Sequence, residues 1–128
     1  MNAGFDEYGL DYGIPPVVQV RYGFVVTDAE KFVGCISGLT HNEWFYISDL
    51  WLEKQFRRKG LGKQLLDRLE TRVANENITG IYTYTGGHQA PAFYEKQGYE
   101  VFSELRNYYP GGHSRIGVRK NLALRKSG

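Results

Sequence analysis

The sequence has a single cysteine, a small net charge and no long apolar run, and each shortage excludes a class of protein. Cys35 alone cannot form an internal disulfide or a cysteine-based metal cluster, which favours the reducing cytoplasm and predicts no metal site. The formal net charge of +2 is too small to indicate nucleic-acid binding. No apolar stretch approaches the ~20 residues of a membrane span, and no signal-like pattern opens the chain, so we expect no membrane partner.

Aromatic residues, in contrast, are abundant: ten tyrosines, seven phenylalanines and two tryptophans among 128 residues. The hydrophobic share of 41% and the charged share of 23% are ordinary for a globular protein, and the length is enough for one hydrophobic core. Glycines and the Pro15-Pro16 pair interrupt regular pairing near the start of the chain. We therefore predict an N-terminal arm over residues 1–16 and a single domain over residues 17–128.

The pattern of apolar residues predicts six strands and two helices. From Gly60 to Glu76, leucines and Val73 recur at helical spacing, with charged residues that include Glu70 on the opposite side. Alternating or β-branched runs between turns indicate strands. The predicted order is βββαβαββ, which is an α+β fold with a mostly antiparallel sheet. The predicted elements are, in chain order, Val17–Thr27, Phe32–Leu39, Trp44–Leu52, the helix Gly60–Glu76, Gly80–Thr85, the short helix Ala90–Gln97, Tyr99–Asn107 and Arg115–Leu122.

The segment Gln55–Lys63 joins a predicted strand to a predicted helix through a basic turn with two glycines. Backbone N–H groups can approach an anion at Gly60 and Gly62, and the positive end of a helix faces the same point. The consecutive cations Arg57–Lys59 add charge that suits phosphate. Neither the three-glycine dinucleotide fingerprint nor the Gly-Lys-Ser/Thr of a Walker loop is present. The pattern therefore predicts a phosphate-bearing ligand, with a solvated basic turn as the alternative.

Two motifs give this chain a resemblance to a known family. Arg57-x-x-Gly60-x-Gly62 is similar to the acyl-CoA pyrophosphate loop of the GCN5-related N-acetyltransferases (GNAT). Downstream, Ala90–Tyr99 resembles the family's short helix that ends in Tyr-x-x-x-Gly-aromatic, with a predicted strand between the two motifs. The resemblance extends from about Val17 to the C-terminus, so we expect a short single-domain member of this family.

The resemblance implies a GNAT-like mixed sheet flanked by helices, in which two parallel strands splay apart and acyl-CoA lies in the wedge. The family's usual N-terminal strand and helices are expected to be reduced, since only 16 residues precede Val17. Main-chain groups of the strand would hold the pantetheine arm, and the basic loop would hold the pyrophosphate. The residues that the resemblance assigns to acetyl-CoA are Trp51, Leu52, Arg57, Arg58, Lys59, Gly60, Leu61, Gly62 and Lys63.

Transfer of an acetyl group from a thioester to an amine needs a base for the amine and a hydrogen-bond donor for the departing thiolate. Tyr94 is the donor that the family motif implies, and a core aromatic is its alternative role. Asp49 is the candidate base, because a carboxylate inside the otherwise apolar run Phe45–Leu52 needs an explanation. The alternative for Asp49 is a structural hydrogen bond or ion pair within the sheet.

We therefore expect an acetyl-CoA-dependent N-acetyltransferase that passes the acetyl group directly to a primary amine of a small molecule or peptide. Two alternatives stay open: a non-catalytic acyl-CoA-binding or assembly module with this fold, and a binder of other nucleotide phosphates through the same loop. A reduced N-terminus should leave a sheet edge or face uncovered, and a two-fold homodimer would bury it.

Overall fold

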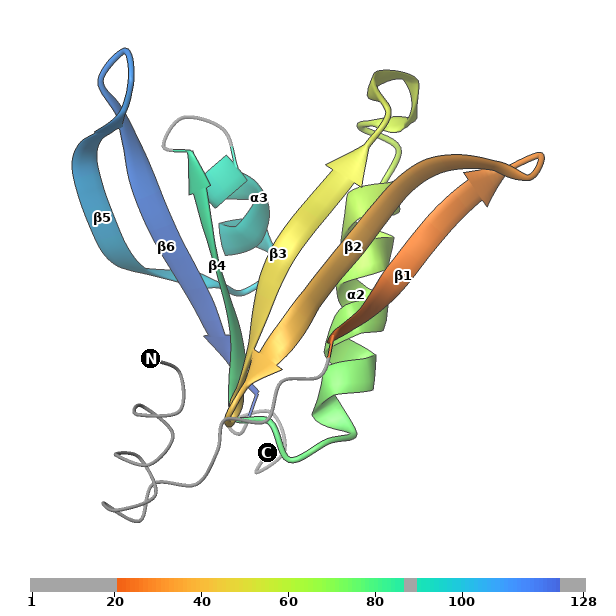
Figure 1. Cartoon of the computed structure of the whole chain (residues 1–128), viewed down its shortest axis with the longest axis horizontal. Helices are drawn as coiled ribbons and strands as arrows, with labels where there is room; N and C mark the ends of the chain where they lie inside the picture. Colours follow the sequence, from red (N-terminus) through yellow and green to blue (C-terminus); the bar gives the residue numbers. More distant parts are fainter. Residues whose placement is uncertain (1–20, 87–89, 123–128) are drawn as a thin grey trace, which may run out of the picture.

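The computed structural model describes residues 21–86 and 90–122, which form one sheet and its helices (Figure 1). The order of the elements in the structure confirms the predicted βββαβαββ succession and adds a short 3₁₀ helix, η1, before α2. The predicted arm over residues 1–16 and the start of the first predicted strand lie outside the described residues. The elements are β1 (Arg21–Asp28), β2 (Lys31–His41), β3 (Trp44–Leu52), η1 (Lys54–Phe56), α2 (Leu61–Ala74), β4 (Gly80–Gly86), α3 (Ala90–Lys96), β5 (Glu100–Tyr109) and β6 (His113–Asn121).

The strands form one six-stranded sheet in the order β1-β2-β3-β4-β6-β5. All neighbouring strands are antiparallel except β3 and β4, which run parallel. The parallel ladder is short, running from Trp44↔Gly80 to Tyr46↔Tyr82. Past this point the two strands separate, and the sheet opens into the V seen in Figure 1. The predictions of a mostly antiparallel sheet and of a splayed parallel pair are confirmed.

A β-bulge in β3 lies where β3 leaves β4. The β2–β3 register passes from Gly38↔Ile47 directly to Ser37↔Asp49, so Ser48 is the extra residue. A bulge bends its strand and increases the local twist. The bulge at Ser48 therefore helps to turn the end of β3 away from β4, at the level where the V opens.

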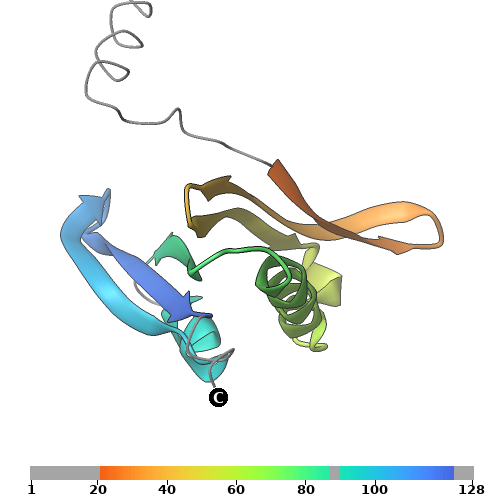
Figure 2. The ribbon, with the colours of Figure 1, turned by 90° about the horizontal axis from the view of Figure 1, so that it is seen from below.

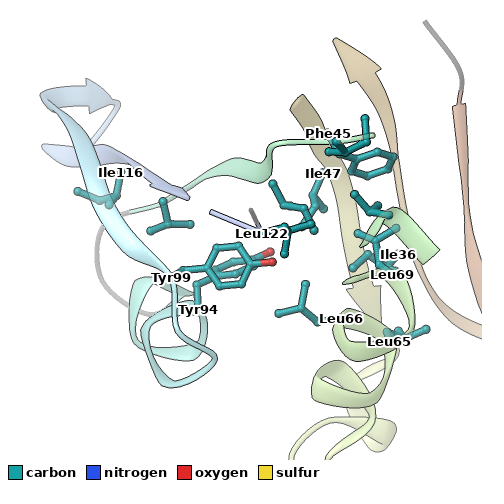
Figure 3. Packing of buried hydrophobic residues seen from close by; sticks show 14 residues of the cluster. Ile36, Phe45, Ile47, Leu65, Leu66, Leu69, Tyr94, Tyr99, Ile116 and Leu122 are labelled. Atoms are coloured by element: carbon teal, nitrogen blue, oxygen red, sulfur yellow. The ribbon is translucent and has the colours of Figure 1, made fainter. Parts of the chain in front are cut away.

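Figure 2 shows both helices on the same face of the sheet, with α2 against β1–β3 and α3 against the other half. The apolar side of α2 is almost fully buried: Leu65, Leu66, Leu69 and Val73 are at most 3% exposed. Side chains from both halves of the V join them in one buried cluster (Figure 3). This shared core holds the two diverging halves of the sheet together.

Glu70 departs from the predicted amphipathic pattern of α2. The sequence places it on the outer, charged side, but it is only 4% exposed in the structure. Its carboxylate accepts hydrogen bonds from Lys120 Nζ at 3.0 Å and from the Tyr99 hydroxyl at 2.9 Å. A carboxylate is stable inside the protein only when it is paired in this way. The prediction was wrong because the partners, Lys120 in β6 and Tyr99 just before β5, lie far along the chain.

Candidate active site

The gap between the diverging strands β3 and β4, which we call the wedge, contains a cavity of about 460 Å³. At its narrow end Thr83 Oγ1 donates to the Ile47 carbonyl at 2.8 Å. Farther along, the β3 edge that faces β4 has no ladder partner among the described residues, so its backbone groups, apart from the Leu52 carbonyl that Arg57 reaches, are available to a ligand. The cavity is lined by Ile47, Ser48, Asp49, Leu50, Trp51, Thr83, Tyr84, Thr85, Phe93 and Tyr94.

A second cavity, of about 790 Å³, continues from the wedge to the start of α2. The two cavities share Leu50, Trp51 and Phe93, so they form one groove along β3. Seven of the nine residues predicted to hold acetyl-CoA line this second cavity. Its full lining is Leu50, Trp51, Leu52, Arg57, Arg58, Gly60, Gly62, Lys63, Phe93 and Lys96.

The other two predicted residues point elsewhere. Lys59 Nζ lies 5.8 Å from the centre of the Phe56 ring. Leu61 lines a separate cavity toward β1, together with Phe24 and Leu65. Their side chains are therefore outside the lining of the groove, although both residues belong to the segment that shapes it.

Phe93 and Lys96 of α3 line the groove although the sequence analysis did not single them out. They are three residues apart and so share one side of the helix. This spacing within the second motif could have indicated that both face the groove. An added Cβ at Gly62 would lie 3.5 Å from the Phe93 ring, so the start of α2 and α3 approach each other closely. Phe93 therefore forms a wall of the groove, and Lys96 adds a cation to it.

The backbone before α2 is shaped to receive an anion. Arg58 (φ 61°) and Gly60 (φ 80°) both adopt the left-handed conformation, which is unfavourable for Arg and natural for Gly. Gly60 is the N-cap of α2, and no side chain caps the helix. The N–H groups of the first turn therefore have no partner within the helix and, with the positive end of the helix dipole, attract an anion in the groove.

The basic side chains of the loop have different roles. Arg57 Nε donates to the Leu52 carbonyl at 2.9 Å, which ties the loop to the end of β3. Lys63 forms a solvent-exposed ion pair with Asp67 at 2.9 Å, and such a pair is weak in water. Among the described residues, Arg58 makes neither a hydrogen bond nor an ion pair. The Arg58 guanidinium is therefore the loop side chain most available to a phosphate.

Tyr94 reaches the wedge from α3 and is only 6% exposed. Its ring packs edge-on against Phe93 and Tyr99, with ring centres 5.2 and 5.4 Å away, and Figure 3 shows the pair Tyr94 and Tyr99. Burial raises the pKa of Tyr94 to about 12, because the phenolate would lose its hydration. Tyr94 is thus both a core aromatic and a wall of the wedge, and it stays a neutral hydrogen-bond donor at physiological pH.

A buried network holds α3, and with it Tyr94, in place. Besides its bond to Glu70, Lys120 Nζ donates to the Gln97 carbonyl at 2.7 Å, immediately after α3. The Tyr99 hydroxyl donates to the other oxygen of Glu70. Helix α2, strand β6 and the end of α3 are therefore connected through one carboxylate.

Asp49 lies in the same wedge cavity as Tyr94, but its side chain is exposed. Its Oδ2 accepts hydrogen bonds from Ser48 Oγ at 3.1 Å and from Ser37 Oγ at 3.3 Å. These bonds and the solvent explain how an apolar strand accommodates a carboxylate here. The structure brings Asp49 and Tyr94 to one cavity, and the role of Asp49 as a base stays a prediction.

Within residues 21–86 and 90–122, no three His, Cys, Asp or Glu side chains lie close enough together to hold a metal ion. Over the same residues, no helix is long and apolar enough to cross a membrane. The groups that the groove offers are backbone N–H groups, cations, the phenols of Tyr84 and Tyr94, Ser and Thr hydroxyls and one carboxylate.

Comparison with protein families gives a match over most of the chain. Residues 20–101 match the family model described as an acetyltransferase (GNAT) domain. The chain is also 31% identical over 104 residues to blasticidin-S acetyltransferase from Streptomyces morookaense. That alignment covers 80% of this chain and 76% of the relative.

Solved structures share the fold. An acetyltransferase from Bacillus cereus has a TM-score of 0.81 and 25% identity, with 94% of this chain and 91% of that chain covered. An aminoglycoside 6'-N-acetyltransferase complexed with coenzyme A has a TM-score of 0.72 and 21% identity, with coverage of 80% and 73%; this similarity shows the fold alone. Because the family model spans residues 20–101, well over half of the sequence, the chain belongs to the GNAT family of acetyltransferases.

Proposed function

We propose that this protein is an acetyl-CoA-dependent N-acetyltransferase that passes the acetyl group directly to a primary amine of a small molecule or peptide. The observation that carries the proposal is the groove, in which the anion-binding loop, the unpaired edge of β3 and Tyr94 line adjoining cavities. The names of two relatives, blasticidin-S acetyltransferase and aminoglycoside 6'-N-acetyltransferase, support a small-molecule acceptor. We place the activity in the cytoplasm, which a chain with one cysteine suits.

Acetyl-CoA is proposed to lie along β3 with its pyrophosphate at the start of α2. The N–H groups after Gly60 and the Arg58 guanidinium would hold the phosphates. The pantetheine amides would pair with the backbone near Trp51 and Leu52, where β3 has no β4 partner within residues 21–86 and 90–122. This position brings the thioester into the wedge beside Tyr94.

The acceptor amine must lose a proton during the reaction. An amine with a pKa of about 10.4 is neutral in only about one molecule in 2,500 at pH 7, which costs about 4.6 kcal/mol. We assign the base to Asp49, because its carboxylate lies in the wedge and is open to solvent. It would attract the ammonium form, which loses its first proton to solvent before it can attack, and Asp49 would accept the second proton as the new C–N bond makes the nitrogen more acidic.

Tyr94 is proposed to stabilise the leaving group. The nitrogen lone pair attacks the thioester carbonyl carbon, the C–N bond forms, and the C–S bond breaks to release the CoA thiolate. With the pKa of Tyr94 at about 12 and that of a thiol near 8.5, full proton transfer is uphill by about 5 kcal/mol. Tyr94 therefore donates a hydrogen bond to the sulfur, and the proton lost by the amine reaches the thiolate through solvent.

We also propose that the protein is a two-fold homodimer. Edge strand β5 exposes large apolar side chains, with Val101 46%, Leu105 49% and Tyr108 50% exposed. Proteins usually cover such an edge, and a self-complementary contact is the commonest way to do so. Sedimentation at micromolar concentration should give twice the chain mass, and a monomer would overturn this part of the proposal.

Thiol release from acetyl-CoA in the presence of a panel of primary amines tests the reaction. We expect release that depends on the amine, with Asp49→Asn lowering kcat about hundredfold. Ser37→Ala is the matched control, since it removes a bond to Asp49 but keeps the carboxylate. Full activity in Asp49→Asn would make Asp49 structural. A protein that binds acetyl-CoA but acetylates no amine would be the non-catalytic module instead.

A further inference from the structure

A third cavity, of about 240 Å³, lies next to the wedge and is walled by aromatic rings. Along β4 the side chains alternate: Ile81 and Thr83 are buried toward the helices, so Tyr82 and Tyr84 project from the opposite face of the sheet. Tyr84 lines both this cavity and the wedge. The aromatic cavity is therefore a direct extension of the site in which the acetyl group would be transferred. Its lining is Trp44, Tyr82, Tyr84, Phe102 and Arg119.

The rings of the aromatic cavity form a continuous contact. The ring centres of Trp44 and Tyr82 are 6.1 Å apart, those of Tyr82 and Tyr84 are also 6.1 Å apart, and those of Tyr84 and Phe102 are 5.9 Å apart. Gly117 lies beneath them, and an added Cβ there would come within 2.9 Å of Phe102 and 3.0 Å of Tyr84. The rings can approach each other in this way only because that position has no side chain.

Arg115 contacts Tyr84, a wall of the same cavity, and has no anionic partner among the described residues. Its guanidinium carbon lies 4.2 Å from the centre of the Tyr84 ring and 5.2 Å from that of Tyr108. Its only hydrogen bond among the described residues is to the Tyr108 hydroxyl at 3.4 Å. Arg119, by contrast, forms an ion pair with Glu100 at 2.9 Å. Arg115 thus retains donors that can form a bidentate pair with a carboxylate.

We propose that the aromatic cavity and Arg115 bind the acceptor, and that the acceptor is a primary amine that carries an aromatic ring and a carboxylate. The inference rests on the proposed function and names its substrate class. The amine enters the wedge, the ring packs among Tyr82, Tyr84 and Phe102, and the carboxylate pairs with Arg115. A polyamine is a poor fit, because the Arg115 guanidinium places positive charge where its second cation would lie.

Two matched pairs of amines test this class. Tyrosine and tyramine differ only in a carboxylate beside the amine, and 4-(aminomethyl)benzoate and benzylamine differ only in a carboxylate across the ring. We expect kcat/KM to be at least about tenfold higher for the acid in one of the pairs. Arg115→Gln should bring that ratio close to one, mainly by lowering kcat/KM for the acid. Arg106→Gln is the control, because Arg106 is 84% exposed and, among the described residues, its one ion pair is with Glu104.

The outcomes separate this inference from the proposed function. The substrate class would be overturned if amines were acetylated with no preference for the acid in either pair, or if the preference survived Arg115→Gln. Either result would leave the proposed acetyltransferase activity in place. If no amine is acetylated, saturation-transfer NMR on the CoA-loaded protein decides the inference by itself. Stronger binding of 4-(aminomethyl)benzoate or tyrosine than of its neutral partner, lost in Arg115→Gln, would support it; equal binding would overturn it.

Discussion

The two sides of the wedge are constructed in different ways. The loop side, from Leu50 to Lys63, is a continuous piece of chain, and it offers mainly backbone groups: the unpaired edge of β3 and the N–H groups at the start of α2. The aromatic side is assembled from side chains of β3, β4, β5 and β6 that are up to 75 positions apart, from Trp44 to Arg119. A binding site made of backbone groups requires particular side chains at few positions. A binding site made of side chains changes its shape and chemistry when those side chains are substituted.

This difference suggests how one fold serves different acceptors. The loop side can keep its ligand through large changes in sequence, because glycine conformations and a helix start define it. The aromatic side can be altered without disturbing the core, since its rings project from the face of the sheet opposite α2 and α3. We therefore expect substitutions on one side of the wedge to leave the other side functional, and the following predictions test this independence.

The largest effect on stability should come from breaking the buried Glu70–Lys120 pair, which connects α2 to β6 across the two halves of the sheet. Glu70→Leu leaves Lys120, whose side chain is 18% exposed, without its carboxylate in a largely buried place. Removing one partner of a buried pair costs about 4 kcal/mol, so the free energy of unfolding should fall by about that amount in urea denaturation. The double variant Glu70→Leu/Lys120→Met should recover most of the loss. A change under about 1 kcal/mol in the single variant would show that this network does not join the halves.

Tyr94, at the meeting point of the two sides, should make stability depend on alkaline pH. Its pKa is about 10 in the unfolded chain and about 12 in the folded protein. Because the folded protein holds the phenol proton more tightly, the contribution of Tyr94 to the free energy of unfolding is fully present below pH 10. That contribution is lost as the pH rises from 10 through 12. The contribution of Tyr94 to this loss is about 3 kcal/mol, and it should disappear in Tyr94→Phe, whereas the contributions of Tyr22 and Tyr82, whose pKa values burial also raises, should stay. Parallel stability curves for the two proteins over this range would contradict the assigned burial effect.

The same substitution separates catalysis from binding. Tyr94→Phe removes only the hydroxyl, so the ring packing against Phe93 and Tyr99 is retained. We expect kcat to fall about hundredfold because the thiolate loses its hydrogen bond, while the Kd of acetyl-CoA changes less than twofold. Stopped-flow measurement of the acetyl-transfer step checks this. An unchanged rate would leave Tyr94 as a core aromatic alone.

A change at Gly60 should affect only the loop side. An added side chain meets nothing within 4 Å, but the φ of 80° strains any β-branched residue. Gly60→Val should therefore shift the loop backbone and weaken acetyl-CoA binding at least about tenfold with the fold intact. Gly111→Val is a matched control: Gly111 has a φ of 88° in the β5–β6 turn, away from the groove. Equal losses of affinity in both variants would indicate a general effect of strain.

A change at Gly117 should affect only the aromatic side, and more mildly. The new methyl group of Gly117→Ala would push against Phe102 and Tyr84, raising KM for the acceptor about fivefold while the Kd of acetyl-CoA stays constant. Gly86→Ala is the control, since a Cβ at that strand position meets nothing within 4 Å. Steady-state kinetics with both substrates varied would measure the two constants. A loss of acetyl-CoA affinity in Gly117→Ala would refute the independence of the two sides.

The same comparison explains what the sequence could predict. The loop side could be predicted because its glycines and cations are consecutive, and the order of elements followed from hydrophobic periodicity. Even there, a spacing pattern does not say which side chains face the groove, so Lys59 and Leu61 were included and Phe93 and Lys96 were missed.

Features that depend on distant strands were beyond sequence reasoning. The bulge at Ser48 depends on the register with β2, and the burial of Glu70 depends on Lys120, fifty positions away. The aromatic cavity depends on rings from three strands and on Arg119 from a fourth. The composition showed that aromatic residues were numerous, but not which of them would gather beside the wedge.

The central claim is that the groove along β3 binds acetyl-CoA, and isothermal titration calorimetry tests it most directly. We predict one acetyl-CoA per chain with a Kd in the micromolar range, typical of a substrate of such enzymes. Desulfo-CoA should compete with acetyl-CoA for the groove, whereas ATP and NAD should compete poorly. No binding at hundreds of micromolar acetyl-CoA, or stronger competition by ATP than by desulfo-CoA, would contradict the account.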